Sequence, residues 1–222
     1  MERMPYRPNA DAAVVSTMPL AASLPTQSND WRTGLPTLTG TMVTLRELRV
    51  TDAPALLLAL TTEEVTRYLS PPPATVEGFE RFIARTHGRR AAGENACFAI
   101  APRDSDIAIG LFQVRSLEAN FGNAEWGFAL MSEFWGTGVF LDGARLVIDF
   151  TFETLGSNRL EARAATANAR GNGALRKIGA VREGILRKSL RCSGEYLDQS
   201  LWTILAEDWR DAKATCRSPV IH

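Results

Sequence analysis

Hydrophobic positions recur with regular spacing from about residue 39 onward, and this spacing predicts where strands and helices lie. Alternation of apolar and polar side chains is typical of strands, whereas recurrence every three or four residues is typical of helices. We expect strands at residues 41–49, 97–102, 107–117, 123–131, 159–167, 181–190 and 197–205. We expect helices at residues 55–60, 63–69, 75–92, 138–155 and 171–178. This order predicts an α/β fold with one mixed sheet and helices on both faces.

Glycine, proline and small polar residues mark the ends of these elements. Segment 51–54 places a candidate N-cap and an early proline before an apolar run, which is typical of a helix start. The prolines at 71–73 end the following helix, because proline lacks the backbone N–H that a helix requires. The polar turn 103–106 joins two strands into a hairpin, and the glycine at 156 ends the strongly apolar helix.

The first 38 residues lack this regularity. Five prolines stand there among serine, threonine and asparagine, so we expect an N-terminal extension at 1–38. A folded domain at 39–210 and a C-terminal tail at 211–222 follow. The extension could pack across the domain, exchange into a neighbouring subunit or be disordered. Polar residues and Pro19 interrupt its one apolar stretch, so the pattern does not predict a secretory signal.

Composition and charge narrow the class of protein. Hydrophobic residues make up 45% and charged residues 23%, which is ordinary for a globular protein. The 25 basic and 25 acidic residues balance, so a nucleic-acid partner is not expected. No run approaches the roughly 20 apolar residues that span a bilayer, so a membrane partner is not expected either. Three widely spaced cysteines and two histidines predict free thiols in a reducing cytoplasm and no metal site.

Segment 125–139 carries the most informative chemistry. A strand leads into a turn with glycines at 136 and 138, and a long helix leaves that turn. Such a turn lets backbone approach a ligand closely, and the helix N-terminus offers free N–H groups that suit a pyrophosphate. The P-loop pattern is absent, and Leu141 stands where a dinucleotide fingerprint needs its third glycine. A plain tight turn between strand and helix would produce the same two glycines.

Several segments together extend this interpretation. The stretch 132–142 resembles the acetyl-CoA-binding motif of the GNAT acyltransferase superfamily. Segment 168–180 is similar to that superfamily's second motif, an asparagine followed by a helix that ends in Lys-x-Gly. Segments 181–187 and 198–209 are similar to the branch that contains the ribosomal-protein alanine N-acetyltransferases. The resemblance covers most of the chain, and ordered motifs at the right separations are more specific than any single one.

The resemblance implies a GNAT fold, in which a mixed, mostly antiparallel central sheet has helices on both faces, and a set of cofactor-binding residues. It implies that the backbone amides of Gly136, Thr137, Gly138 and Val139 hold the pyrophosphate of acetyl-CoA, the co-substrate. The strand around Leu130 would pair with the pantetheine arm and offer an N–H to the thioester carbonyl. Asn168 would contact the cofactor arm or order the helix that follows it.

A base is needed because a free amine is mostly protonated at neutral pH. Glu125 is the candidate, since alternation places it on the same strand face as Gly127 and Ala129. An acidic residue at a strand end also commonly pairs with a neighbouring arginine. Glu133 is expected to point to solvent, because a carboxylate beside a pyrophosphate is unfavourable. Asp142, in the first turn of the long helix, is expected to complement the helix dipole.

A general acid is harder to assign. Many GNAT enzymes place a tyrosine in the second motif, where this chain has Leu175, and the ribosomal-protein branch often has a serine where this chain has Gly171. Tyr196 is the candidate replacement, with Ser189 and Cys192 as alternatives. The thiolate could also leave without an acid, since a thiol of pKa near 8.5 is a fair leaving group.

The sequence therefore predicts a cytoplasmic N-acyltransferase that moves an acetyl group from acetyl-CoA to a primary amine by direct attack. The acceptor is a protein N-terminus or a small-molecule amine. A non-catalytic module that binds acyl-CoA or a partner protein is the alternative, motivated by Leu175 and Gly171. Aromatic residues around the glycine turn are assigned to the core, and a homodimer formed through the C-terminal strands stays open.

Overall fold

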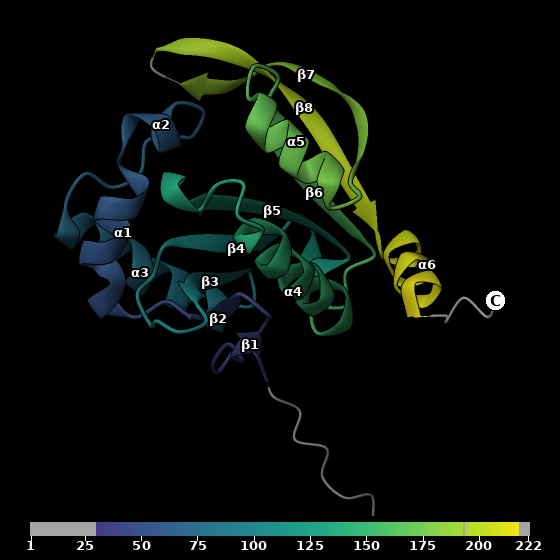
Figure 1. The fold of residues 1–222 in the computed structure, drawn as a ribbon, viewed down its shortest axis with the longest axis horizontal. Coiled ribbons are helices and arrows are strands. Elements are labelled where there is room, and N and C mark those ends of the chain that lie inside the picture. Colours follow the sequence, from purple (N-terminus) through teal and green to yellow (C-terminus); the bar gives the residue numbers. More distant parts are fainter. Residues whose placement is uncertain (1–29, 193, 218–222) are drawn as a thin grey trace, which may run out of the picture.

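The computed structural model describes residues 30–192 and 194–217. The strands in this part of the chain form one sheet of eight, in the spatial order β1-β2-β3-β4-β5-β6-β8-β7 (Figure 1). They are β1 (Leu38–Thr39), β2 (Val43–Glu47), β3 (Asn95–Pro102), β4 (Gly110–Ser116), β5 (Asn123–Leu130), β6 (Arg159–Ala165), β7 (Val181–Cys192) and β8 (Glu195–Leu205). Neighbours run antiparallel, except that β5 and β6 are parallel. The expected mixed, mostly antiparallel sheet is confirmed.

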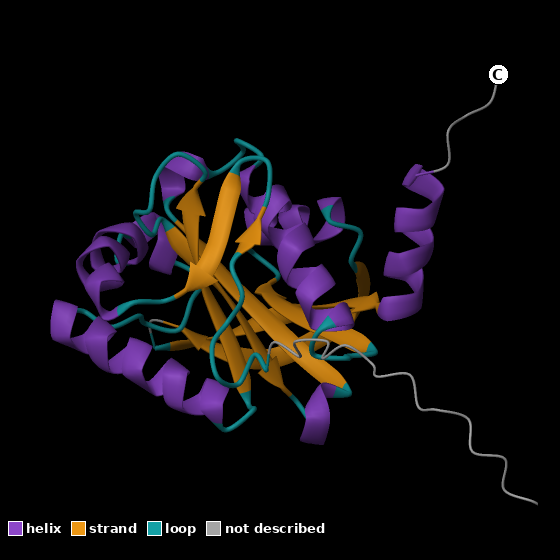
Figure 2. Cartoon of the chain, turned by 90° about the horizontal axis from the view of Figure 1, so that it is seen from below, coloured by secondary structure: helices purple, strands orange, loops and turns teal. Residues whose placement is uncertain are grey.

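Helices cover both faces of this sheet, as the sequence predicts (Figure 2). They are α1 (Ala53–Leu60), α2 (Glu63–Thr66), α3 (Val76–Ala91), α4 (Val139–Glu153), α5 (Ala169–Lys177) and α6 (Ala206–Arg217). Apolar residues of α1 and α3, among them Phe79 and Ile83, pack against one face. On the other face, α4 buries Val147 and Ile148, and α5 buries Leu175 in the same cluster. The helices α1, α3, α4 and α5 thus each bury apolar residues against the sheet.

Both ends of the folded unit extend beyond the bounds expected from the sequence. Trp31 is 7% exposed and packs edge-on against Phe121 at 5.4 Å between ring centroids. The carbonyl of Arg32 accepts a hydrogen bond from Arg90, and β1 pairs with β2. Residues 30–38 therefore pack against the domain, whereas residues 1–29 of the predicted extension lie outside the described residues.

The predicted tail at 211–222 begins inside α6. The indole N–H of Trp209 donates to Asp149 of α4 at 2.7 Å, and the ammonium of Lys213 reaches the same carboxylate at 2.8 Å. These two contacts hold α6 against α4. Residues 211–217 are thus helical, and residues 218–222 lie outside the described part.

A single carboxylate ties the start of α4 to the start of β2. Asp142 accepts hydrogen bonds from the backbone N–H groups of Thr41, Met42 and Val43 at 3.2, 2.8 and 3.1 Å, and from the Thr41 hydroxyl at 2.9 Å. Partial burial alone would raise the pKa of Asp142, but these hydrogen bonds outweigh it and hold that pKa below its ordinary value. Asp142 therefore joins segments about a hundred positions apart, beyond the helix-dipole role expected of it.

Replacing this carboxylate tests its contribution to stability. We expect Asp142→Asn to lower the free energy of unfolding by about 1–3 kcal/mol at neutral pH, because an amide nitrogen cannot accept from the backbone donors. The folded pKa lies below the unfolded value of about 3.9, so the carboxylate stabilises the fold above that pH. Its contribution is lost as the pH falls through the folded pKa.

Urea unfolding of both proteins between pH 3 and pH 7 measures this difference. Asp104→Asn is the matched control, because Asp104 is exposed and forms no hydrogen bond or ion pair with other described residues. An unfolding free energy for Asp142→Asn that equals the control at every pH would contradict the assignment.

Candidate functional site

The sheet opens between β5 and β6. These strands pair over only three positions, from Asn123–Arg159 to Glu125–Glu161. Beyond that point β5 continues beside β4 as far as Leu130, and β6 continues beside β8 as far as Ala165. Each strand therefore keeps one hydrogen-bonded neighbour and turns its other edge toward the opening.

The direction of the backbone groups on β5 follows from its ladder with β4. The N–H of Met131 donates to the carbonyl of Ile109, and the N–H of Leu117 donates to the carbonyl of Asn123, both at 2.9 Å. Residues with odd numbers on β5 therefore bond to β4, and alternation turns the N–H and C=O groups of Phe128 and Leu130 toward the opening. The sequence predicts a free backbone N–H at Leu130, and the register between β5 and β4 turns that N–H toward the opening.

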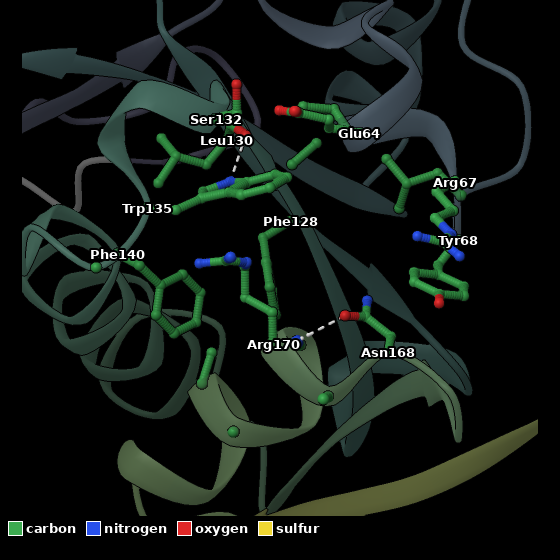
Figure 3. A pocket seen from close by; sticks show the side chains of 18 of the residues that line it. Glu64, Arg67, Tyr68, Phe128, Leu130, Ser132, Trp135, Phe140, Asn168 and Arg170 are labelled. Atoms are coloured by element: carbon green, nitrogen blue, oxygen red, sulfur yellow. Dashed lines mark hydrogen bonds between the residues drawn. The ribbon is translucent and has the colours of Figure 1, made fainter.

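A cavity of about 1000 Å³ fills the opening (Figure 3). Its walls come from the end of β5, the turn into α4, the segment containing α2, and the first turns of α5. Lining residues fall within 64–69, 128–141 and 167–177. The rings of Phe128 and Phe140 stand 4.5 Å apart between centroids and form part of one wall. This volume is in the range of a binding site for a sizeable small molecule.

The glycine turn lies on the rim of this cavity. Gly136 and Gly138 have φ angles of 79° and 97°, which disfavour residues with a side chain, and both line the cavity. Gly138 is the N-cap of the fifteen-residue α4 and has no side-chain cap. The first intrahelical bond there runs from the Asp142 N–H to the Gly138 carbonyl. The amides that precede it, including that of Val139, have no acceptor within the helix, and such amides at a helix N-terminus suit an anionic group.

Thr137 and Asn168 hold the backbone around the cavity. The Thr137 hydroxyl donates to the Phe134 carbonyl at 2.8 Å and so steadies the glycine turn. Asn168 is the N-cap of α5, and its side-chain oxygen accepts from the Gly171 N–H at 2.8 Å. Of its two expected roles, Asn168 performs the ordering of the next helix, and it also lines the cavity. A Cβ at position 171 would lie 2.7 Å from the Asn168 amide, so glycine fits there and serine would crowd it.

The candidate general acids lie elsewhere. Tyr196 is 55% exposed on β8, Ser189 bonds to Leu186 and Gln199, and neither is among the residues that line the cavity. The Cys192 thiol donates to two backbone carbonyls, and Cys192 is not a lining residue either. Leu175, at the usual tyrosine position, is 1% exposed and belongs to the core.

The candidate base Glu125 also lies outside this cavity. Its carboxylate oxygen Oε2 stands 2.9 Å from Arg115 and 3.4 Å from Arg163. Its side chain is 17% exposed and lines a separate pocket of about 130 Å³ with Gln113. Of the predicted cofactor-binding residues, the cavity is lined by Leu130, Gly136, Gly138 and Asn168 but not by Thr137 or Val139. Neither Glu125 nor Tyr196 lies beside them.

Several residues line the cavity that sequence reasoning did not assign to it. Trp135, expected in the core, donates from its indole N–H to the Leu130 carbonyl at 2.8 Å. The Arg170 guanidinium stacks over its ring at 4.6 Å, so the pair bridges the cavity from α5 (Figure 3). Glu64 and Tyr68 enter from the α2 segment. No local sequence pattern distinguishes these last two, because the contacts of α2 with the rest of the fold place them there.

Residues 30–192 and 194–217 contain no cluster of three or more histidine, cysteine or acidic side chains that could hold a metal ion. No helix in the same part of the chain is long and apolar enough to cross a membrane.

Comparison with known proteins shows which family the chain belongs to. Residues 42–181 match the family model described as an acetyltransferase (GNAT) domain. The probable N-acetyltransferase YjcK of Bacillus subtilis is 30% identical over 179 residues, which cover 77% of this chain and 98% of that protein. The putative ribosomal N-acetyltransferase YdaF of the same organism is 26% identical over 175 residues, with 77% and 95% covered.

Solved structures show the same fold. A putative acetyltransferase from T. thermophilus is 28% identical, has a TM-score of 0.68, and the match covers 83% of this chain and 97% of that one. Mycobacterium smegmatis RimJ in complex with CoA-disulfide has a TM-score of 0.73 at 19% identity, with 85% and 97% covered. The chain therefore belongs to the GNAT acetyltransferase family and is an N-acetyltransferase.

Proposed function

We propose that this protein transfers an acetyl group from acetyl-CoA to a primary amine by direct attack of the amine on the thioester. One observation carries the proposal: the glycine turn at the start of α4 and the β5 residues whose amides face the opening line the same cavity. A pyrophosphate needs the first feature, and an extended amide-containing arm with a thioester needs the second.

The residues fit acetyl-CoA along its length. The amides of Gly136, Thr137, Gly138 and Val139 would hold the pyrophosphate at the positive end of the α4 dipole. The pantetheine arm would pair with β5 as an added strand, and the Leu130 N–H would polarise the thioester carbonyl. One such donor contributes on the order of 3 kcal/mol to transition-state stabilisation.

The acceptor class rests on the named relatives. The similarity to YdaF, a putative ribosomal N-acetyltransferase, supports a protein N-terminus as acceptor, and small-molecule amines stay open. A non-catalytic acyl-CoA-binding module is the second candidate, because Leu175 is buried and Gly171 leaves no hydroxyl at the second motif. Glu125 as base, Tyr196 as acid, a cytoplasmic location and a homodimer stay predictions from the sequence.

Ligand binding and turnover test this proposal together. CoA should raise the melting temperature saturably, as RT ln(1 + [L]/Kd) requires, and acetyl-CoA should release free thiol only when an acceptor amine is present. The assay panel contains short peptides with free N-termini and small primary amines. Stabilisation without thiol release across the panel would favour the non-catalytic module, and no stabilisation at high CoA concentration would contradict the proposal.

A glycine substitution distinguishes an effect on pyrophosphate binding from an effect on the stability of the fold. Gly136 and Gly156 have φ angles of 79° and 74°, and a Cβ at either would meet no atom within 4 Å, but only Gly136 lines the cavity. Alanine at either position should cost about 1–2 kcal/mol of stability through backbone strain. Only Gly136→Ala should raise the Kd for CoA, by about tenfold or more, which corresponds to about 1.4 kcal/mol.

Calorimetric titration with CoA measures both Kd values, and Gly156→Ala is the matched control. Equal Kd values in the two variants would show that the glycine turn does not bind the pyrophosphate.

A further inference from the structure

The cavity contains two carboxylates besides its amides. Among its lining residues, Glu64 of α2 and Glu133 of the turn into α4 are the acidic ones. Glu133 stands three positions before Gly136 and three after Leu130, on the backbone segment that the proposed function assigns to the cofactor. Glu64 instead extends from α2 toward the end of β5, where Leu130 and Ser132 lie (Figure 3). Glu64 is therefore the carboxylate that faces the end of β5 from a segment to which no cofactor contact is assigned.

The carboxylate of Glu64 is free to serve a ligand. Within the described part of the chain it forms no hydrogen bond or ion pair. Glu125 differs, because Oε2 of its carboxylate already contacts Arg115 and Arg163 and because it faces a separate pocket. An incoming ammonium group would meet Glu64 without displacing an existing partner.

The segment that carries Glu64 is fixed over the cavity from two sides. Val65, the next residue, is 7% exposed and packs into the cluster formed by α1 and α3. The Cys192 thiol, at the tip of the β7–β8 hairpin, donates to the carbonyls of Arg67 and Leu69 at 3.4 and 3.5 Å. These contacts hold α2 in place before any ligand arrives, which a positioned proton acceptor requires.

We propose that Glu64 is the general base of the transfer, a catalytic residue that takes the proton from the acceptor ammonium directly or through one water. This assignment rests on the proposed function. Loss of one proton to the carboxylate frees the nitrogen lone pair, which forms the C–N bond with the thioester carbonyl carbon. The C–S bond breaks, and the sulfur leaves with its electron pair and takes up the second proton released by the nitrogen. Glu64 then returns its proton to water.

Other charged or titratable side chains share this cavity and surround the reaction. They are Glu133 from the turn into α4, Arg67 and Tyr68 from the α2 segment, and Arg170 and Lys177 from α5. The positive charges of α5 would attract the phosphates of CoA, whereas Glu64 would attract the acceptor ammonium.

The test compares Glu64→Gln with Glu63→Gln, since both residues are exposed on the same helix but only Glu64 lines the cavity. The probe is acetyl-CoA with the panel amine that the unaltered protein turns over fastest. At pH 7, kcat/KM for that amine should fall by about 10²–10⁴ in Glu64→Gln and stay close to the unaltered value in Glu63→Gln. The loss should shrink as the pH rises, because the free amine then no longer needs a base.

Binding measurements separate this role from a structural one. CoA should stabilise Glu64→Gln against heat as much as it stabilises the unaltered protein. Added amine should stabilise the CoA-loaded unaltered protein more than the CoA-loaded variant, which has lost the charge that attracts the ammonium.

Three results would overturn the assignment while leaving the proposed function standing. The first is full activity in Glu64→Gln, and the second is a loss of activity in Glu64→Gln that persists unchanged at high pH. The third is the pH-dependent loss in Glu125→Gln or in Glu133→Gln but not in Glu64→Gln. Failure of the unaltered protein to turn over any panel amine would instead overturn the proposed function, and the assignment of Glu64 with it.

Discussion

The limited contact between β5 and β6 is the constraint on which the site depends. Parallel pairing stops after Glu125, so the backbone groups of Phe128 and Leu130 face a cavity instead of a neighbouring strand. Had the ladder continued to Leu130, those groups would have been used within the sheet and no edge would remain for a ligand. The sheet tolerates the gap because β4 and β8 each hold one of the diverging strands by antiparallel pairing.

Contacts between distant segments keep the walls of this gap in place. Asp142 fastens the start of α4, and with it the glycine turn, to the backbone at Thr41–Val43. Cys192 fastens the tip of the β7–β8 hairpin to the segment that follows α2. One wall is thus held by the first strands of the sheet and the other by the last. The cavity is built before a ligand binds, which lowers the entropic cost of binding.

Most of the chemistry proposed for this cavity is performed by the backbone. In the proposed function, the pyrophosphate would be held by amides around Gly136 and Gly138, and the thioester carbonyl would be polarised by the amide of Leu130. Backbone groups do not depend on side-chain identity. The second motif can therefore have Leu175 in the core and glycine at 171 without losing the binding site. What the backbone cannot supply is a proton acceptor, and the α2 segment brings a carboxylate to the cavity for that role.

The sequence by itself determined the features that depend on local pattern. Alternation and helical spacing predicted the strands and helices from β2 to β8, and the glycine turn was found because positive φ angles at Gly136 and Gly138 demand glycine. It did not predict β1 or α6, which are stabilised by pairing with β2 and by Asp149. Tertiary structure alone decided that Glu64 enters the cavity while Glu125 pairs with arginines. Those placements follow from contacts such as that between Cys192 and Arg67, 125 positions apart, and no local pattern encodes a contact at that separation.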